Sequence, residues 1–260
     1  MTETTSTQVP QPAMRKPRSR FVAILRYTLQ SCVPPRKWAA LLLPCAGALL
    51  FGLLAHAVHT SAERAFANVA AEGIFSLVMP IAALVIGDSV LGAEVRAGTF
   101  HFTWLSPAAT WQIVLGRWLG GSMVALVTIA PASALAAFVA GAPSSAWPAF
   151  IAAAVGSITY VALFITVGCI TRRTAVWSLA IVFLVERLLG AALTGIAQLS
   201  PTWESRAIFV GLLDNPPDRL VRAGIPQGGA AIVRLAIVTI ICLLIANWRM
   251  RHMRLSGASD

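Results

Sequence analysis

The sequence predicts an all-α integral membrane protein, with six transmembrane helices preceded by an amphipathic helix at the membrane surface. Hydrophobic residues make up 57% of the 260 residues, charged residues only 12%, and the mean hydropathy is +0.76. A soluble chain carries about 25% charged residues, so this chain cannot cover its surface with polar groups in water. Six apolar segments, each long enough to cross about 30 Å of hydrocarbon, leave little room for an appended soluble enzyme.

The N-terminal part of the chain is expected to lie at the cytoplasmic face. Residues 1–20 predict a disordered, basic tail, because they are rich in Thr, Gln and Pro and end in a cluster of Arg and Lys. Residues 21–35 predict an amphipathic interfacial helix that ends at Pro34 and Pro35. Its apolar face, at helical spacing, consists of Phe21, Ile24, Leu25, Thr28 and Cys32.

The transmembrane domain is expected over residues 36–250, with residues 251–260 as a second cytoplasmic tail. Pro131 predicts a bend or an interruption in the third apolar segment. The apolar run 208–213 is too short to span a membrane, so it predicts either a short interfacial or re-entrant helix or a solvated loop. The six apolar segments are 38–59, 71–91, 111–140, 148–170, 174–198 and 229–248, and the two long connections are the inner loop 92–110 and the outer segment 199–228.

The basic residues predict a multi-pass plasma-membrane protein with both termini in the cytoplasm. With the N-terminus inside, the inner segments hold 14 of the 20 lysines and arginines, as the positive-inside rule requires. The net charge of +10 therefore indicates orientation in a bilayer and not binding to nucleic acid. The 14 inner residues are Arg15, Lys16, Arg18, Arg20, Arg26, Arg36, Lys37, Arg96, Arg117, Arg172, Arg173, Arg249, Arg251 and Arg254.

The cysteine and histidine positions indicate no metal site. The four cysteines form no C-x-x-C pair and lie in or beside apolar segments, so they are interpreted as small buried hydrophobic residues. His56, His59 and Glu63 are spaced so that they share one helical face, which could bind a metal. The alternative, that they are interfacial polar residues at the end of a span, is preferred.

The inner loop 92–110 is the most distinctive connection. It begins with Glu94 and Arg96, continues through a break at Gly98 into a partly apolar run, and stops at Pro107 before the third apolar segment. A partly apolar segment at the cytoplasmic surface could dock a partner protein. It could equally be an ordinary loop that lies on the lipid headgroups.

Four features of this region resemble the signature of ABC-2 type permeases, the transmembrane subunits of ATP-binding-cassette exporters. That family has a glutamate, a Gly-Thr pair, an apolar run, a proline and a Gly-Lys pair that leads into the third span. Arg117 keeps the charge of the usual lysine, whereas His101 and Trp104 stand where the family usually has aliphatic residues. The matching residues are Glu94, Gly98-Thr99, Pro107 and Gly116-Arg117.

The resemblance implies the permease half of an exporter, with ABC-2 type architecture. It implies a second permease chain, identical or related, and a separate P-loop ATPase subunit that holds ATP and Mg. It implies alternating access driven by ATP hydrolysis on that partner, with an amphipathic substrate such as a drug, antibiotic, lipid or glycan. The residues expected to couple the chain to the ATPase are Glu94, Gly98, Thr99, Phe100, Phe102, Trp104, Pro107 and Arg117.

The ATPase is not expected in this chain itself. A P-loop needs a Gly-rich loop followed by Lys-Ser or Lys-Thr. The two lysines, Lys16 and Lys37, do not follow such a loop. The chain is therefore predicted to have no enzymatic activity and no cofactor of its own.

Three polar residues at or within apolar segments are candidates for the transport pathway or for a dimer contact. Glu186 and Arg187 lie about 18 Å from the inner end of the fifth segment, where charged side chains are costly and usually functional. The alternatives are a hydrogen bond between spans, or a fifth span that begins later in the chain. Asp88 lies near the inner end of the second segment, where a polar residue can also simply face water. Gly116 and Gly120 form a G-x-x-x-G pattern that favours close helix packing, or occurs by chance.

Two other functions fit the same topology. A membrane-embedded lipid-modifying enzyme would need clustered catalytic groups, for which only Asp88, Glu186 and the group around His56 are available. An accessory subunit without its own pathway could have an identical topology.

Overall fold

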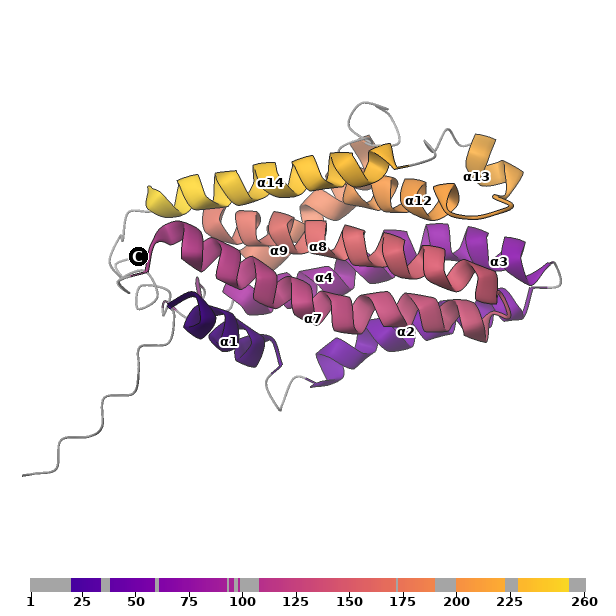
Figure 1. The fold of residues 1–260 in the computed structure, drawn as a ribbon, viewed down its shortest axis with the longest axis horizontal. Coiled ribbons are helices and arrows are strands. Elements are labelled where there is room, and N and C mark those ends of the chain that lie inside the picture. The colour runs from indigo at the N-terminus through magenta and orange to yellow at the C-terminus, as the bar shows by residue number, and fades with distance from the viewer. Residues whose placement is uncertain are drawn as a thin grey trace, which may run out of the picture.

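The computed structural model describes residues 20–33, 38–58, 61–92, 94–95, 98, 108–171, 173–189, 200–222 and 229–252, and every regular element within these ranges is a helix. The long helices lie side by side along one direction and form an elongated bundle (Figure 1). The predicted all-α class is therefore confirmed. Residues 1–19, 99–107 and 253–260 lie outside the described residues.

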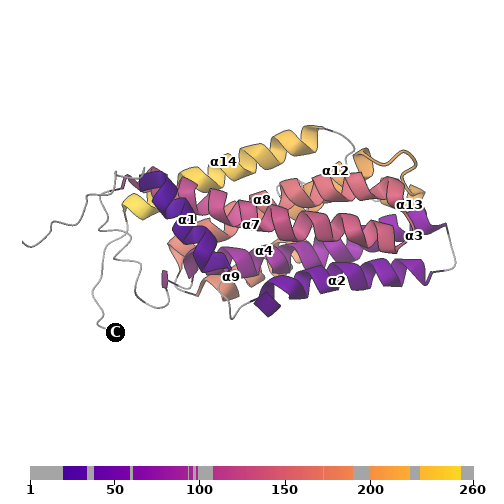
Figure 2. The same cartoon turned by 60° about the horizontal axis from the view of Figure 1, so that its bottom comes forward.

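The amphipathic helix lies at one end of the bundle. Helix α1 (Arg20–Cys32) packs against the start of α7 (Thr110–Val139), and both views show it at that end (Figures 1 and 2). Thr28 and Cys32, on the predicted apolar face, are buried, whereas Val22 and Tyr27 are half exposed. The predicted helix at 21–35 is thus present, and its described part ends at Cys32.

The second predicted span is longer than the sequence suggests. After α2 (Trp38–His56), a continuous helical rod of 31 residues runs from Ala62 to Gly92. It contains the second predicted span and is called the second rod below. The apolar segment predicted there starts at residue 71, and the helix begins nine residues earlier, at Ala62. The polar residues Glu63, Arg64 and Asn68 lower the hydropathy of the first two turns but do not break a helix.

This rod alternates between α-helical and wider π-helical turns. Its parts are α3 (Ala62–Val69), η1 (Ala70–Val78), α4 (Met79–Gly87) and η2 (Asp88–Gly92). Pro80 follows η1 directly and has no backbone N–H, and its ring would clash with the carbonyl four residues earlier. The wider turn accommodates the proline, because the Met79 N–H bonds to the Ile74 carbonyl, five residues back.

The next two helices form the centre of the bundle. Helix α7 is followed by the turn at Gly141 (φ 78°), η3 (Pro143–Ser145) and α8 (Ala146–Ile170). Of the two alternatives predicted at Pro131, the interruption is wrong, because α7 is one continuous helix through that residue. Close packing of α7 against α2 and α8 supports it there: a Cβ at Gly52 of α2 would lie 2.5 Å from the Ala136 carbonyl oxygen.

The C-terminal half adds shorter elements. The fifth segment begins as α9 (Thr174–Ala180) and η4 (Ile181–Leu189). The outer segment contains α12 (Pro201–Gly211) and α13 (Asp218–Arg222), so the short helix that was one alternative there exists. The last helix is α14 (Ala230–Arg251).

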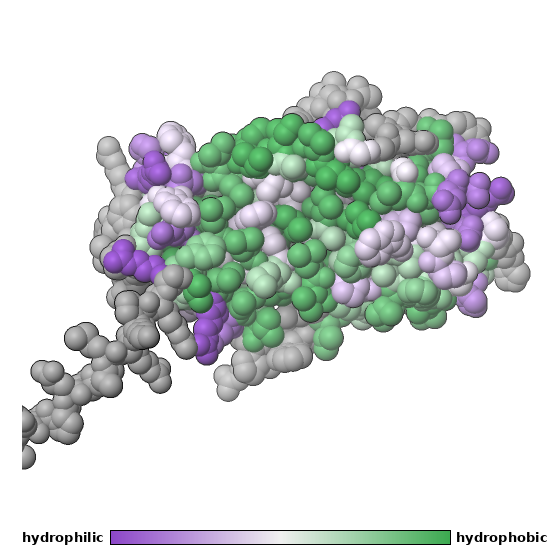
Figure 3. Space-filling model, in the orientation of Figure 1, coloured by the Kyte–Doolittle hydropathy of each residue, from purple (hydrophilic) through white to green (hydrophobic). Residues whose placement is uncertain are grey.

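Four helices in the described part of the chain are long and apolar enough to cross a membrane. They are Ala62–Gly92, Thr110–Val139, Pro143–Ile170 and Ala230–Arg251, while Leu42–His56 and Thr174–Leu184 are shorter apolar helices. Figure 3 shows hydrophobic residues over the middle of one face of the bundle and hydrophilic residues toward both ends. These features identify a multi-pass membrane protein.

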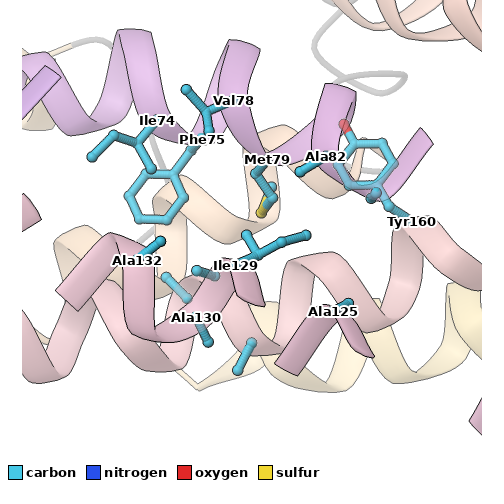
Figure 4. Packing of buried hydrophobic residues seen from close by; sticks show 14 of the residues in the cluster. Ile74, Phe75, Val78, Met79, Ala82, Ala125, Ile129, Ala130, Ala132 and Tyr160 are labelled. Carbon is cyan, nitrogen blue, oxygen red and sulfur yellow. The ribbon is translucent and has the colours of Figure 1, made fainter. Parts of the chain in front are cut away.

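The core depends on small side chains. Alanine is the commonest buried residue of α7 and α8, which lets neighbouring helices approach closely, as is usual in lipid. Larger residues of η1 and α4, such as Phe75 and Met79, fill the space opposite Ile129 and Ala132 of α7 (Figure 4).

Candidate functional site

A buried ion pair joins the start of the inner loop to α7. The Arg117 guanidinium donates from Nη2 to Glu94 Oε2 at 2.6 Å, and the two side chains are only 1% and 11% exposed. Arg117 also donates from Nη1 to the Val90 carbonyl of η2. Arg117 lies two turns into α7 and Glu94 follows η2 directly, so the contact links the second rod to α7 just before the loop leaves.

Helix α1 covers this ion pair. Gly116 and Gly120 face α1 and not another long span: a Cβ at Gly116 would lie 2.9 Å from Ile24 Cγ2, and one at Gly120 would lie 2.8 Å from Thr28 Cβ. Burial and a hydrogen bond to the Glu94 carboxylate raise the pKa of the Tyr27 hydroxyl. Thus α1, the second rod and α7 meet at one charged cluster, formed by Tyr27, Glu94 and Arg117.

The other residues that were expected to couple the chain to an ATPase are only partly described by the structure. Gly98 lies in a turn with φ 68°, a backbone conformation that favours glycine, and a Cβ there would have open space around it. Thr99, Phe100, Phe102, Trp104 and Pro107 lie outside the described residues. Thr110, where α7 begins, donates to Asn247 Oδ1 at 3.1 Å and accepts from Arg251 Nε at 3.2 Å, so the loop also ends beside the end of α14.

A second polar cluster lies within the bundle around Glu186, one of the pathway candidates. Glu186 Oε2 accepts hydrogen bonds from the Tyr160 hydroxyl at 2.5 Å and from Ser200 Oγ at 2.7 Å. The Tyr160 hydroxyl also lies 2.6 Å from Thr202 Oγ1. The cluster therefore joins α8, η4 and the first turn of α12. Glu186 Oε1 is shielded and has no hydrogen-bond partner in the structure. The side chain of Arg187 is outside the described residues.

Helix α12 is held to two other helices by ion pairs. Arg206 donates to Glu72 Oε2 at 2.6 Å and to the Ala71 carbonyl at 2.7 Å, which links α12 to η1. Arg234 of α14 donates to Glu204 Oε1 at 3.1 Å, where Glu204 is buried and Arg234 is 38% exposed. The aromatic rings of Phe66, Phe75 and Phe209 pack against each other beside these contacts.

The other sequence candidates are not brought into a common site. Asp88 begins η2 and is partly buried. Glu63 accepts a hydrogen bond from Ser144 at 2.7 Å, and His59 lies outside the described residues. Within the described ranges, no group of three His, Cys, Asp or Glu side chains could hold a metal ion. Three of the four cysteines, Cys32, Cys169 and Cys242, are buried.

Sequence reasoning missed the partners of the charged residues. Tyr27, Tyr160, Ser200 and Thr202 carry no pattern that marks them, because each meets its carboxylate across a distance of many residues along the chain. The rarity of tyrosine could have marked two of these partners, because the chain has only two tyrosines. Both tyrosines contact a glutamate that the sequence had already singled out.

The chain is similar to a known family over most of its length. The model of a family described as "ABC-2 family transporter protein" matches residues 5–207, which include α1, the inner loop, the Glu94–Arg117 pair and the Glu186 cluster. A search of curated proteins gave no match. Because the family match covers well over half of the chain, this protein belongs to the ABC-2 transporter family, as a transmembrane subunit whose 260 residues contain no ATPase domain.

Proposed function

We propose that this chain is the permease subunit of an ABC exporter, and that it moves an amphipathic substrate by alternating access. In this proposal two permease chains, identical or related, work with two copies of a separate P-loop ATPase. The ABC-2 family implies an ATPase partner in general. ATP and Mg belong to that partner, and this chain supplies the membrane pathway.

Six spans are proposed, which adds two to the four long helices. Helix α2 has 19 residues, or about 28 Å at 1.5 Å per residue, which is close to the thickness of the hydrocarbon. The fifth segment is helical from Thr174 to Leu189 and is apolar over its first part. With α2 and this segment included, the N- and C-termini lie on the same side.

The proposed orientation places that side in the cytoplasm. Arg20 and Arg26 of α1 and the two arginines at the end of α14, Arg249 and Arg251, lie at the same end of the bundle (Figure 1). The positive-inside rule favours the cytoplasm for this end. The inner loop leaves the bundle here, where a cytoplasmic ATPase could reach it.

The single observation that carries the coupling proposal is the buried pair between Glu94 and Arg117. A loop that docks on an ATPase can move the spans only if its ends are held firmly to them. The ion pair fixes the start of the loop to α7, and the hydrogen bond of Arg117 to the Val90 carbonyl fixes α7 to η2. Force on residues 92–110 would therefore act on the second rod, α7 and α1 together.

The experiment is affinity purification of the tagged chain from its native membrane in mild detergent. We expect a stoichiometric P-loop protein to co-purify, with vanadate-sensitive ATPase activity, and Phe100→Asp to release it. Leu212→Asp is the matched control, because Leu212 is an exposed apolar residue at the opposite end of the bundle, and this variant should retain the partner.

Two results would favour the alternatives. A chain that purifies alone, with no vanadate-sensitive ATPase in any fraction, would favour a membrane-embedded lipid-modifying enzyme that uses Asp88 and Glu186. An ATPase complex whose transport tolerates bulky charged residues at Gly98 and Thr99 would favour an accessory subunit.

A further inference from the structure

We propose that Glu186 binds the positively charged group of the transported substrate, so that the substrate class is an amphipathic organic ammonium compound. This inference rests on the proposed function and assigns the chemistry of its binding site. It is carried by the unequal surroundings of the two carboxylate oxygens of Glu186.

One oxygen has its full set of donors and the other has none. Tyr160 and Ser200 both donate to Oε2, at 2.5 and 2.7 Å. A carboxyl oxygen has two acceptor sites, so these two hydroxyl donors occupy both sites of Oε2. Oε1 is shielded from solvent and has no partner in the structure. A buried acceptor without a donor is costly, and a ligand that brings a donor would remove that cost.

Among the carboxylates that the structure describes around α12, Glu186 is the one without an arginine partner. Glu72 pairs with Arg206, and Glu204 pairs with Arg234. Glu186 interacts with the hydroxyl groups of Tyr160 and Ser200 and with the side chain and backbone of Thr202. The N-terminal end of α12, which Ser200 caps, adds a favourable but partial positive charge. The cluster therefore leaves one carboxyl oxygen of Glu186 with a free acceptor site, where a positively charged donor from outside the chain would stabilise the carboxylate.

The chemistry favours an ammonium group over a metal ion. Calcium and magnesium take six or more oxygen ligands, whereas this site offers one free carboxylate oxygen. An ammonium group needs only a charged hydrogen bond to that oxygen. Tyr160 belongs to the buried apolar core (Figure 4), so an apolar body attached to the ammonium would meet apolar side chains. Because Oε1 is shielded here, binding belongs to a conformation in which α12 has moved away from η4.

The test compares a charged and an uncharged probe that have the same shape. The full chain in lipid nanodiscs is titrated with a dansyl-labelled alkyl amine and with the matching dansyl-labelled alcohol, and binding is followed by fluorescence anisotropy against protein-free nanodiscs. We expect the wild type to bind the amine at least about tenfold more tightly than the alcohol, as a charged hydrogen bond in a buried site predicts. Glu186→Gln should abolish this difference and leave the affinity for the alcohol unchanged.

A second variant separates charge from packing. Tyr160→Phe removes one donor but keeps the carboxylate, so it should still prefer the amine to the alcohol. Equal affinity of the wild type for the two probes overturns the inference, and this comparison needs no variant to fold. Failure of the wild type to bind either probe, or undiminished amine preference in Glu186→Gln, also overturns it.

The outcome is distinguishable from failure of the proposed function. The binding measurement needs neither ATP nor an ATPase. A chain that co-purifies with an ATPase but does not distinguish the two probes contradicts only this inference. A chain that prefers the amine but has no ATPase partner contradicts the exporter.

Discussion

Replacing Arg117 with methionine should destabilise the protein far more than replacing an exposed arginine at the same end of the bundle. Methionine keeps most of the volume and removes the charge, so Glu94, which is only 11% exposed, loses the cation 2.6 Å from its Oε2. Breaking a buried pair by removing one partner costs about 3–5 kcal/mol. The Val90 carbonyl loses a donor as well, which adds about 1 kcal/mol.

The same reasoning predicts that a second substitution rescues the first. In Arg117→Met most of the cost is the charge left on Glu94, so adding Glu94→Gln should restore about 2 kcal/mol of the unfolding free energy. The single change Glu94→Gln should also be destabilising, because it removes the negative charge that faces the buried Arg117 guanidinium. A coupling free energy of about 2 kcal/mol or more is therefore expected from the double-mutant cycle.

The assay is unfolding of the detergent-solubilised chain, followed by the fluorescence of its eight tryptophans. Arg251→Met is the matched control, because Arg251 is exposed and contacts Thr110 by a single hydrogen bond; it should change stability by at most about 1 kcal/mol. If the two single substitutions add to within about 0.5 kcal/mol in the double variant, the two side chains are not coupled and the role given to the pair is refuted.

Two further predictions concern the contact between α1 and this cluster. Gly120→Ala should push α1 away, because the new Cβ would lie 2.8 Å from the Thr28 side chain; it should cost about 1–3 kcal/mol and speed maleimide labelling of the buried Cys32 in a variant without the other cysteines. Gly229→Ala, with nothing within 4 Å of the new Cβ, is its control, and equal labelling rates in both would contradict the packing. In a variant that lacks the other tyrosine, the absorbance of tyrosinate should show that Tyr27 ionises above its ordinary pKa of 10.0, and Glu94→Gln should lower that pKa. Burial alone would keep part of the shift, so an unchanged titration in Glu94→Gln would exclude the hydrogen bond.

The contacts among α1, the second rod and α7 explain why charged residues, Glu94 and Arg117, flank the inner loop. A buried ion pair is strong only where both partners are held in place, and here α1 closes over them. Substitutions that loosen α1 should therefore weaken coupling to an ATPase without touching the loop. The ATPase activity of the purified complex in Gly120→Ala provides that measurement.

Much of the fold could be predicted because hydropathy and helical periodicity are local properties. The apolar composition requires a membrane environment, and the apolar segments correspond to helices in the described part of the chain. The ends are less well predicted, since helix formation does not require apolar residues: the rod that begins at Ala62 starts with polar turns. Pro131 was expected to bend or interrupt α7, and the helix is not interrupted there.

The sequence by itself determined which residues are unusual, and the tertiary structure decided what each one contacts. Glu94, Arg117 and Glu186 stand out because a charge in or beside an apolar segment is costly, and Gly116 and Gly120 stand out by their spacing. Their partners come from elements far apart in the chain. Only the packing of helices brings Arg117 to Glu94, Tyr160 and Ser200 to Glu186, and α1 onto the two glycines. The local sequence shows where a charged group lies in or beside an apolar segment, where burial is costly. The contacts that offset this cost come from residues far away in the chain, so the sequence alone does not show them.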